Sequence, residues 1–426
     1  MLTLNHFSEL RDKTILGLKK RNWDDDKLGW VDKVAALDIE RKEIQTELDN
    51  LKAFSNQASR EIGNFMKSGQ KGEAESLKSQ VARNKIRISD LESRSDANKS
   101  EMQELLYKIP NIPHASVPAG KGSEDNEVFQ DWTQPMPSLY DGALPHWELA
   151  DKYNLFDLKL GVKITGAGFP LYRGKGAKLQ RALIQFFLDQ ATQAGYEEII
   201  PPHLVNADTA TATGQLPDKD GQMYFCDLDK LYLIPTAEVP ITNILRDEIL
   251  DEKEFPVKFC GYTPCFRREA GSYGADVKGL NRVHQFDKVE IVRAEHPDKS
   301  YQALNEMIEH VKSLLDKLEL PYRILRLCGG DMGFTSALTF DFEIYSAAQK
   351  RWLEVSSVSN FETYQSNRLK LRFRNNEGKT QLAHTLNGSA LALARIVAGI
   401  LENHQTPDGI LIPKALQSYT GFSIIS

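Results

Sequence analysis

The chain has 426 residues, 41% apolar and 26% charged, and this composition is ordinary for a globular protein of two or three domains. Its formal net charge of −6 argues against a surface coated with basic residues, so any contact with nucleic acid must be regional. No apolar run approaches the roughly 18 residues of a membrane-spanning helix, no secretory signal opens the chain, and four scattered cysteines exclude a disulfide framework, so we expect a soluble cytoplasmic protein.

Residues 27–108 carry a heptad pattern that predicts an antiparallel pair of helices. From Val34, eight of ten positions spaced three and four apart are apolar, and the pattern stops at KSGQKG. It resumes at Leu77 with six apolar positions of nine. Such a coiled coil usually joins two chains into a dimer, but here the apolar seams of the two halves can pack against each other within one chain. The second half is weakened by Asn84, Ser95 and Asn98.

The tip of this hairpin carries an excess of cations on an otherwise acidic chain. Between residues 60 and 87, seven cations stand against three glutamates. A basic end on a protruding rod suits a phosphate backbone, although a solvated surface explains the charge equally well. The cations are Arg60, Lys67, Lys71, Lys78, Arg83, Lys85 and Arg87.

Residues 1–109 are therefore interpreted as a helical domain, residues 110–145, rich in Pro, Gly, Ser and Asp, as a linker, and residues 146–426 as a mixed domain. In the last part, helical patterns around 175–194 and 301–318 alternate irregularly with strand-like runs. Several strands follow one another without a helix, which predicts an α+β fold with an antiparallel sheet flanked by helices. The strand candidates are LYLIPT, FPVKFCGYTPCFR, HQFDKVEIV, RWLEVSSVSNF and KLRFRN.

The stretch FRREAGSYGADVKGLNRVHQFDKVEIV joins two of these strands by a long charged loop, which predicts an anion beneath it. Arg267 and Glu269 alternate on a strand and share one face, whereas Arg268 points to the other. An arginine fork binds phosphate or carboxylate, and Phe286 and Glu290 share a face of the returning strand. The glycines that let the loop close over a ligand are Gly271, Gly274 and Gly279.

Three further segments carry polar residues that are singly more often structural than functional. In LYLIPTAEVPITN, Thr236 and Glu238 are expected on one face of a stiffened strand. In TLNGSALALARIVAGILEN we expect a strand, a glycine turn and an apolar helix, whose Arg395 requires an anionic partner. In EVSS, a carboxylate beside hydroxyls is an oxygen ligand set for Mg²⁺. Zinc is not expected, because Cys260 and Cys265 lack a second ligand pair and are interpreted as buried.

Taken in order, these segments resemble the bacterial-type seryl-tRNA synthetases, a family of class II aminoacyl-tRNA synthetases. GYEEIIPP resembles the first class motif, which builds the family's dimer interface, FRREAG through HQFDKVE the second, and LNGSALALAR the third. LIPTAEVP, DMGFTSALTFDFEIY and EVSSVSNFETYQSNR resemble stretches particular to the seryl branch. The departures are small: Arg268 replaces a common serine, Ala390 a common glycine, and LCGGDM the usual CTGDM.

The resemblance implies a homodimeric, ATP- and Mg²⁺-dependent serine–tRNA ligase. It would form seryl-adenylate and transfer serine to the 3′-terminal adenosine of tRNA(Ser), and also of tRNA(Sec). The basic arm would grip the long variable arm of a tRNA bound across the two subunits.

The resemblance also assigns roles to individual residues. Glu238 and Thr236 would hold the serine α-amino group, Arg267 the carboxylate and α-phosphate, Phe286 the adenine and Arg395 the γ-phosphate. The full serine set is Thr236, Ala237, Glu238, Arg267, Glu290 and Ser389. The full ATP set is Arg267, Arg268, Glu269, Val283, Phe286, Glu354, Val355, Ser356, Ser357 and Arg395. Glu354 and Ser357 would hold Mg²⁺, and the seven arm cations would contact tRNA.

Two alternatives remain open from the sequence. A related ligase that charges a carrier protein would keep the adenylation motifs but lack a full arm. A non-catalytic coiled-coil scaffold would be expected to lose Arg267, Glu269, Glu354 or Arg395, and all four are present. We also expect the loop at 269–282 to become ordered only with ATP.

Overall fold

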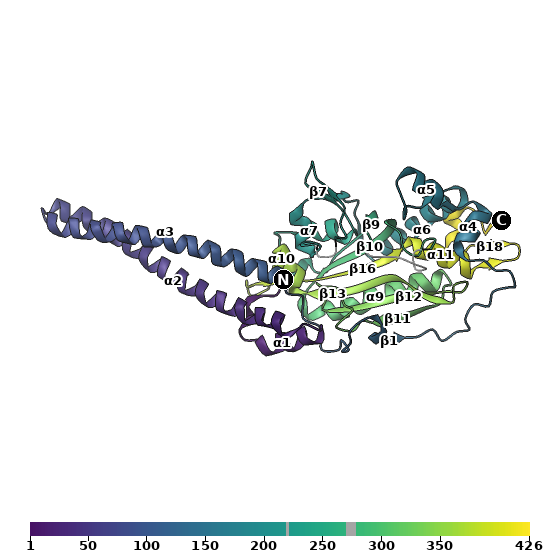
Figure 1. Ribbon diagram of the computed structural model, residues 1–426, viewed down its shortest axis with the longest axis horizontal. Helices are drawn as coiled ribbons and strands as arrows, with labels where there is room; N and C mark the ends of the chain where they lie inside the picture. Colours follow the sequence, from purple (N-terminus) through teal and green to yellow (C-terminus); the bar gives the residue numbers. More distant parts are fainter. Residues whose placement is uncertain (219–220, 270–277) are drawn as a thin grey trace. The chain divides into compact units, whose positions relative to one another are not determined.

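The computed structural model describes residues 1–218, 221–269 and 278–426, and these form two compact units (Figure 1). The smaller unit comprises Leu2–Lys19 and Trp23–Pro110, and the larger comprises Met1, Lys20–Asn22 and Asn111–Ser426. Within the described ranges, no helix is long and apolar enough to cross a membrane.

The smaller unit is dominated by two long helices that run antiparallel, which confirms the predicted helical arm (Figure 1). The Asp24 side chain caps the first of them by accepting a hydrogen bond from the Lys27 amide. Three residues connect the helices, and Gly69 among them adopts a φ of +79°, which glycine tolerates best. The elements are a 3₁₀ turn (Leu4–Phe7), α1 (Arg11–Lys20), α2 (Asp25–Lys67) and α3 (Lys71–Lys108).

The seam between α2 and α3 combines an apolar core with buried polar positions. Ile44, Leu48 and Leu91 form its buried centre. Asn98, which the heptad pattern marks as a weak point, is buried, and its amide donates to the Leu37 carbonyl and to Glu40, each at 3.1 Å. The polar position therefore contributes contacts between the helices rather than a simple gap in the seam.

The larger unit is built on an eight-stranded sheet in the order β1-β11-β12-β13-β16-β10-β9-β4. Every neighbouring pair is antiparallel except β4 with β9, which confirms the predicted sheet type. β1 comes from the segment that the sequence suggests as a linker. The strands are β1 (Glu127–Gln130), β4 (Glu197–Glu198), β9 (Val257–Phe266), β10 (Gln285–Glu295), β11 (Tyr322–Arg326), β12 (Leu338–Ser346), β13 (Arg351–Glu362) and β16 (His384–Ala392).

Helices α6, α9 and α11 pack on this sheet and share one continuous apolar core with it (Figure 1). The helices of this unit are α4 (His146–Tyr153), α5 (Leu158–Ile164), α6 (Gly174–Gln193), α7 (Ala207–Thr213), α8 (Glu238–Thr242), α9 (Ser300–Lys317), α10 (Thr363–Leu369), α11 (Leu393–Asn403) and α12 (Lys414–Thr420). Small sheets lie around it, made of β2 (Phe156–Asp157), β3 (Leu171–Tyr172), β5 (Leu204–Val205), β6 (Phe225–Cys226), β7 (Leu231–Leu233), β8 (Ile249–Asp251), β14 (Arg372–Arg374), β15 (Thr380–Leu382), β17 (Gln405–Thr406), β18 (Gly409–Leu411) and β19 (Ile424–Ile425).

Three local predictions are wrong. Thr236 and Glu238 do not share a strand, because β7 already ends at Leu233 and Glu238 begins α8. Pro240 lies in the first turn of this helix, where a proline loses no backbone hydrogen bond. β9 ends at Phe266, so Arg267 to Glu269 lie beyond the strand, and Glu269 adopts a φ of +49°. Gly388 does not turn the chain but lies inside β16, where an added Cβ would approach Val358 to 3.3 Å.

Candidate active site

A cavity of about 710 Å³ opens on the central sheet and collects most of the residues that the sequence singles out. Among the predicted serine and ATP residues, Ala237 and Arg268 do not line it. Ala237 is buried at the start of α8. The predicted residues that line the cavity are Thr236, Glu238, Arg267, Glu269, Val283, Phe286, Glu290, Glu354, Val355, Ser356, Ser357, Ser389 and Arg395.

One end of the cavity holds two buried carboxylates, Glu238 and Glu290. Burial and repulsion by Glu290 raise the pKa of Glu238 to about 7. The Gln365 amide donates to Glu238 at 2.7 Å, and the Thr236 hydroxyl donates to Glu290 at 3.1 Å. A carboxyl group in this state gains from a ligand that brings a positive charge, because a nearby cation favours the ionised form.

Lys288 completes this end of the cavity. It follows Phe286 and precedes Glu290 on the same face of β10, and its ammonium lies 2.6 Å from the Glu290 carboxylate. The exposed fractions of the two side chains are 6% and 1%. Each of these two charges needs the other, because a buried charge without a partner of opposite sign is costly.

Arg267 and Phe286 lie together in the cavity, whereas Arg268 points elsewhere. The Arg267 guanidinium stands 5.3 Å from the centre of the Phe286 ring, and its Nε donates to the Pro235 carbonyl at 3.3 Å. The Arg268 guanidinium stands over the Tyr224 ring at 5.5 Å. The divergence of these neighbouring arginines agrees with the predicted opposite faces, although neither belongs to a strand.

The roots of the long loop are joined by an ion pair between Glu269 and Arg282. Gly271 and Gly274 lie outside the described residues, and so does the central part of the loop whose ordering we expect to depend on ATP. Cys260 and Cys265 on β9 are buried, as predicted.

Arg395 on α11 is paired, as expected, but it is less buried than the apolar sequence around it indicates. Its Nε donates to the Asn281 carbonyl at 2.8 Å and its Nη1 to the Glu354 carbonyl at 2.6 Å. The Glu354 carboxylate lies 3.9 Å from the same guanidinium. The predicted anionic partner is therefore present within the protein, in Glu354, although the arginine is only partly buried and its guanidinium lines the cavity.

The wall formed by β12 and β13 offers oxygen ligands for a divalent cation. Asp341 lies opposite Ser357 in the strand register and accepts its hydroxyl, and burial together with Glu354 raises the pKa of Asp341. The Asp341 Oδ1 atom is buried and has no hydrogen-bond partner among the described residues. Carboxylates and a hydroxyl are the ligand types that Mg²⁺ prefers, so the residues present fit that ion.

A buried histidine–carboxylate pair supports the far root of the loop. His146 Nδ1 lies 2.7 Å from Glu402, and its Nε2 accepts the Leu280 amide at 2.8 Å, so the neutral imidazole carries its proton on Nδ1. An added Cβ at Gly279, where φ is +63°, would overlap this imidazole. Glu402 and Arg395 belong to the same helix, so one element holds both the root and the cavity arginine.

Sequence reasoning missed several residues that the fold brings to the cavity or its support. Lys288 had a usable signal, because strand alternation places it on the face of Phe286 and Glu290 with the opposite charge. His146 had none, since its contacts are more than a hundred residues away along the chain. The missed residues are His146, Asn281, Lys288, Asp341, Gln365 and Glu402.

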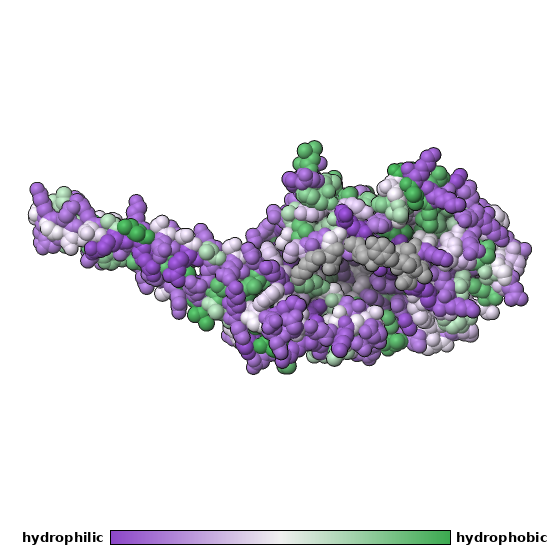
Figure 2. Space-filling model, in the orientation of Figure 1, coloured by the Kyte–Doolittle hydropathy of each residue, from purple (hydrophilic) through white to green (hydrophobic). Residues whose placement is uncertain are grey.

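The arm cations divide into two groups. Arg87 pairs with Glu47 of α2 and with Asp90, and Lys78 lies 3.4 Å from Glu75. Hydrophilic residues cover most of the visible face of the arm (Figure 2). The predicted cations that are exposed and make no ion pair in the described part of the chain are Arg60, Lys67, Lys71, Arg83 and Lys85.

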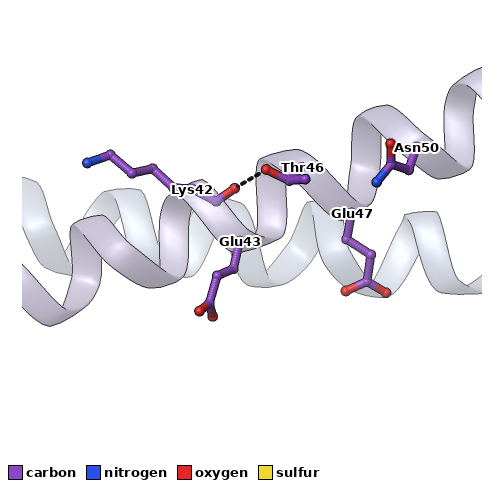
Figure 3. A pocket seen from close by; sticks show the side chains of 5 residues that line it. All are labelled: Lys42, Glu43, Thr46, Glu47 and Asn50. Carbon is purple, nitrogen blue, oxygen red and sulfur yellow. Dashed lines mark hydrogen bonds between the residues drawn. The ribbon is translucent and has the colours of Figure 1, made fainter.

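A second hollow, on one face of α2, does not have the character of a site. Figure 3 shows its side chains spread along a single helix, with Thr46 donating to the Lys42 carbonyl at 2.8 Å. Glu47 already serves the pair with Arg87. The lining residues are Lys42, Glu43, Thr46, Glu47 and Asn50.

Two family models match the chain in the two regions described above. The seryl-tRNA synthetase N-terminal domain matches residues 1–113. The class II tRNA synthetase core domain of the G, H, P, S and T enzymes matches residues 224–404. Together they span the arm and the strands that line the cavity.

Curated relatives and solved structures agree with these matches. The chain is 52% identical to a serine–tRNA ligase of Salinibacter ruber over 93% of this chain and 92% of that protein. It is 43% identical to that of Chlorobaculum parvum over the full length of both. A seryl-tRNA synthetase of Pyrococcus horikoshii, solved with ATP, is 33% identical with a TM-score of 0.91, covering 100% of this chain and 99% of that one. A Naegleria fowleri serine–tRNA ligase solved with AMP is 26% identical with a TM-score of 0.88, over the same shares of both chains.

Proposed function

The chain belongs to the seryl-tRNA synthetase family of class II aminoacyl-tRNA synthetases and has serine–tRNA ligase activity, and we propose that the cavity on its central sheet is where serine and ATP react. The observation that carries this proposal is the meeting, in one cavity, of two buried carboxylates, Arg267 beside Phe286, and the acidic wall of β12 and β13.

Serine binds at the carboxylate end. Its α-ammonium lies between Glu238 and the Thr236 hydroxyl, and its carboxylate faces Arg267. The raised pKa of Glu238 supports this placement, because a bound ammonium restores the ionised carboxylate. Glu290 and Ser389, opposite each other in the register of β10 and β16, face the serine hydroxyl. A site that pairs its polar groups with a hydroxyl leaves them unpaired with alanine, which favours serine.

ATP lies along the rest of the cavity, with adenine stacked on Phe286 between Val283 and the loop roots. Arg267 contacts the α-phosphate, and Arg395 turns from its carbonyl partners to the γ-phosphate. Glu269, Val355 and Ser356 complete the lining. Arg268 and Ala237 do not line the cavity, so their predicted contacts require backbone atoms and stay predictions.

The chemistry needs positioning rather than a protein nucleophile. The serine carboxylate attacks the α-phosphorus in line, and the bond to the pyrophosphate breaks. Arg267 holds both reacting groups and offsets the charge that develops between them. Glu354 and Ser357, with Asp341 behind them, would hold Mg²⁺, which supplies charge neutralisation to the phosphates.

The second half-reaction transfers serine to the 3′-hydroxyl of the terminal adenosine of tRNA(Ser), and we extend it to tRNA(Sec). The arm grips the RNA through its unpaired cations, Arg60, Lys67, Lys71, Arg83 and Lys85. Arg87 and Lys78, which are already in ion pairs, contribute less.

We further propose a cytoplasmic homodimer with tRNA bound across its subunits. The GYEEIIPP segment supports the dimer, because Ile200 beside the edge strand β4 is 86% exposed. An exposed apolar side chain beside the free edge of a sheet suits a contact with a second copy of the chain. Sedimentation with and without Ile200→Glu tests this, and a monomeric wild-type chain would contradict it.

The experiment that tests the activation site is amino-acid-dependent ATP–pyrophosphate exchange with each standard amino acid. We expect exchange with serine and a loss of about 10³-fold in Arg267→Ala, because this arginine serves the reacting groups. Arg268→Ala is the matched control and should change the rate by less than about 3-fold, since its side chain stands over Tyr224.

The alternatives give different results. Exchange with glycine or alanine instead of serine would point to a ligase that charges a carrier protein. No exchange with any amino acid would point to a non-catalytic scaffold. Equal losses in Arg267→Ala and Arg268→Ala would contradict the assignment of the cavity.

A further inference from the structure

The two carboxylates at the serine end of the cavity have different partners, although both are buried. Glu290 is paired with Lys288 at 2.6 Å and also accepts the Thr236 hydroxyl. Glu238 receives the neutral amide of Gln365 at 2.7 Å and makes no ion pair in the part of the chain that the structure describes. Burial, together with repulsion by Glu290, raises the pKa of Glu238 to about 7.

This asymmetry decides which carboxylate a positive charge prefers. An ammonium that enters the cavity gains most from Glu238, whose charge is not yet balanced. At Glu290 it would meet the Lys288 ammonium, and like charges this close repel. Both Lys288 and Glu290 are nearly inaccessible to water, so screening by solvent does not reduce this difference.

We propose that Lys288 is a specificity-determining residue. By balancing the charge of Glu290, it leaves that carboxylate to accept a hydrogen bond from a neutral hydroxyl, and it excludes a substrate with a cationic side chain. This inference rests on the proposed function, because it takes the amino acid to bind at this end of the cavity. It assigns the α-ammonium to Glu238 and the side-chain hydroxyl to Glu290, and it makes the Lys288 charge the reason for the division.

The sharpest probe is 2,3-diaminopropionate, which has the shape of serine with an amine in place of the hydroxyl. The protein with Lys288 rejects it, because its side-chain ammonium would lie beside that of Lys288. When the Lys288 charge is removed, the bare Glu290 carboxylate favours a cation, so a repulsive element becomes an attractive one.

The test compares kcat/KM for serine and for 2,3-diaminopropionate by ATP–pyrophosphate exchange in the full-length enzyme. In Lys288→Met the ratio of diaminopropionate to serine should rise at least about 10-fold, with KM for ATP within about 2-fold. Lys288→Arg retains the charge and should retain the original preference. Lys258→Met is the matched control, because Lys258 lies on the neighbouring strand β9 and its ammonium donates to the Ala194 carbonyl at 2.5 Å.

Two further variants keep the result decisive. Lys288→Gln leaves a hydrogen-bond donor beside Glu290 and so perturbs folding less, and the same ratio is read from it. The double variant Lys288→Met/Glu290→Gln removes both charges and should lose the gain with diaminopropionate. A Lys288→Met or Lys288→Gln ratio that does not rise, or a gain that survives in the double variant, would overturn the inference. The absence of serine-dependent exchange in the unsubstituted enzyme would instead overturn the proposed function.

Discussion

The arm and the cavity use the same kind of charge pair in opposite surroundings. Arg87 and Glu47 lie 2.7 Å apart between α2 and α3, with exposed fractions of 43% and 44%. Lys288 and Glu290 lie 2.6 Å apart on β10, with 6% and 1%. The distances between the charged atoms are nearly equal, so the two pairs differ mainly in how far water reaches them.

This difference separates what each pair does. Water screens the arm pair and competes for its hydrogen bonds, so the pair contributes little to stability. The cavity pair has lost that solvation, so each partner depends on the other and sets the charge that a ligand meets. Substitutions in the two regions should therefore differ in the size of their effects.

Glu238 should make the ligand-free protein less stable as the pH rises. Its pKa is raised from 4.5 to about 7 by burial and by Glu290, so the folded state binds a proton more tightly than the unfolded state. Stability from this group is therefore full below about pH 4.5 and is lost by about pH 7, a change of about 3 kcal/mol. Denaturant unfolding at pH 5 and pH 8 should show this loss in the wild type and not in Glu238→Gln. Parallel pH dependence in the two proteins would contradict the buried charge.

Glu402 should act on ATP through His146 and the loop root. Without its charge, the imidazole is held less firmly against the Leu280 amide, and the contact of Asn281 with Arg395 loosens. We expect Glu402→Gln to lower kcat/KM for ATP by about 10- to 100-fold, with KM for serine within about 2-fold. Glu309→Gln, which removes only an exposed pair with Lys312, is the control. Equal effects of Glu402→Gln on both substrates would indicate a general loss of structure.

The unpaired arm cations should affect tRNA and not adenylation. For the triple variant Lys71→Ala/Arg83→Ala/Lys85→Ala we expect a higher KM for tRNA and unchanged pyrophosphate exchange. The slope of log affinity against log salt should fall by about 1 for each lost phosphate contact. The matched control replaces Lys33, Lys42 and Lys52, each already in an ion pair on the same arm. If the two triple variants weaken tRNA binding alike, pairing does not select the contacts.

The smallest effect should be that of the arm pair itself. A double-mutant cycle on Arg87→Ala and Glu47→Ala should give a coupling of less than about 1 kcal/mol, reduced further by salt. Thermal unfolding at low and high salt measures it. A coupling as large as that of the buried pair on β10 would remove the contrast between the two regions.

The parts of the site that follow from the sequence are those whose chemistry lies in short segments. Arg267, Phe286 and Glu290 come from one loop and its flanking strand, and Glu354 to Ser357 from one strand, so each group stands out in the sequence and the family resemblance supplies its role. The antiparallel sheet follows for a similar reason, because strand-like runs succeed one another without helices. Even so, the local structure at Glu238 and Gly388 was predicted wrongly, because a proline suits a helix start and a glycine suits close packing as well as it suits a turn.

The parts that do not follow depend on distance along the chain. Nothing near His146 indicates that it will accept the Leu280 amide, and nothing near Gln365 indicates that it will donate to Glu238. A single polar residue in an apolar segment has the same appearance whether it supports a cavity or only a core. Lys288 could be predicted only in part. The alternation of side chains along the strand indicates that it lies on the face of Glu290, but it does not indicate that both are buried.

The buried Asn98 in the arm has a consequence for how such a coiled coil changes in length. Its amide links α3 to the Leu37 carbonyl and to Glu40 of α2, and this link fixes which turn of one helix faces which turn of the other. Insertions on the tip side of this link preserve the alignment only when both helices gain the same number of residues, in whole heptads. An insertion in one helix alone would move one group of tip cations past the other. The asparagine thus fixes the register of the coiled coil. Relatives with a longer or shorter arm are expected to differ by equal numbers of residues in the two helices, on the tip side of this position.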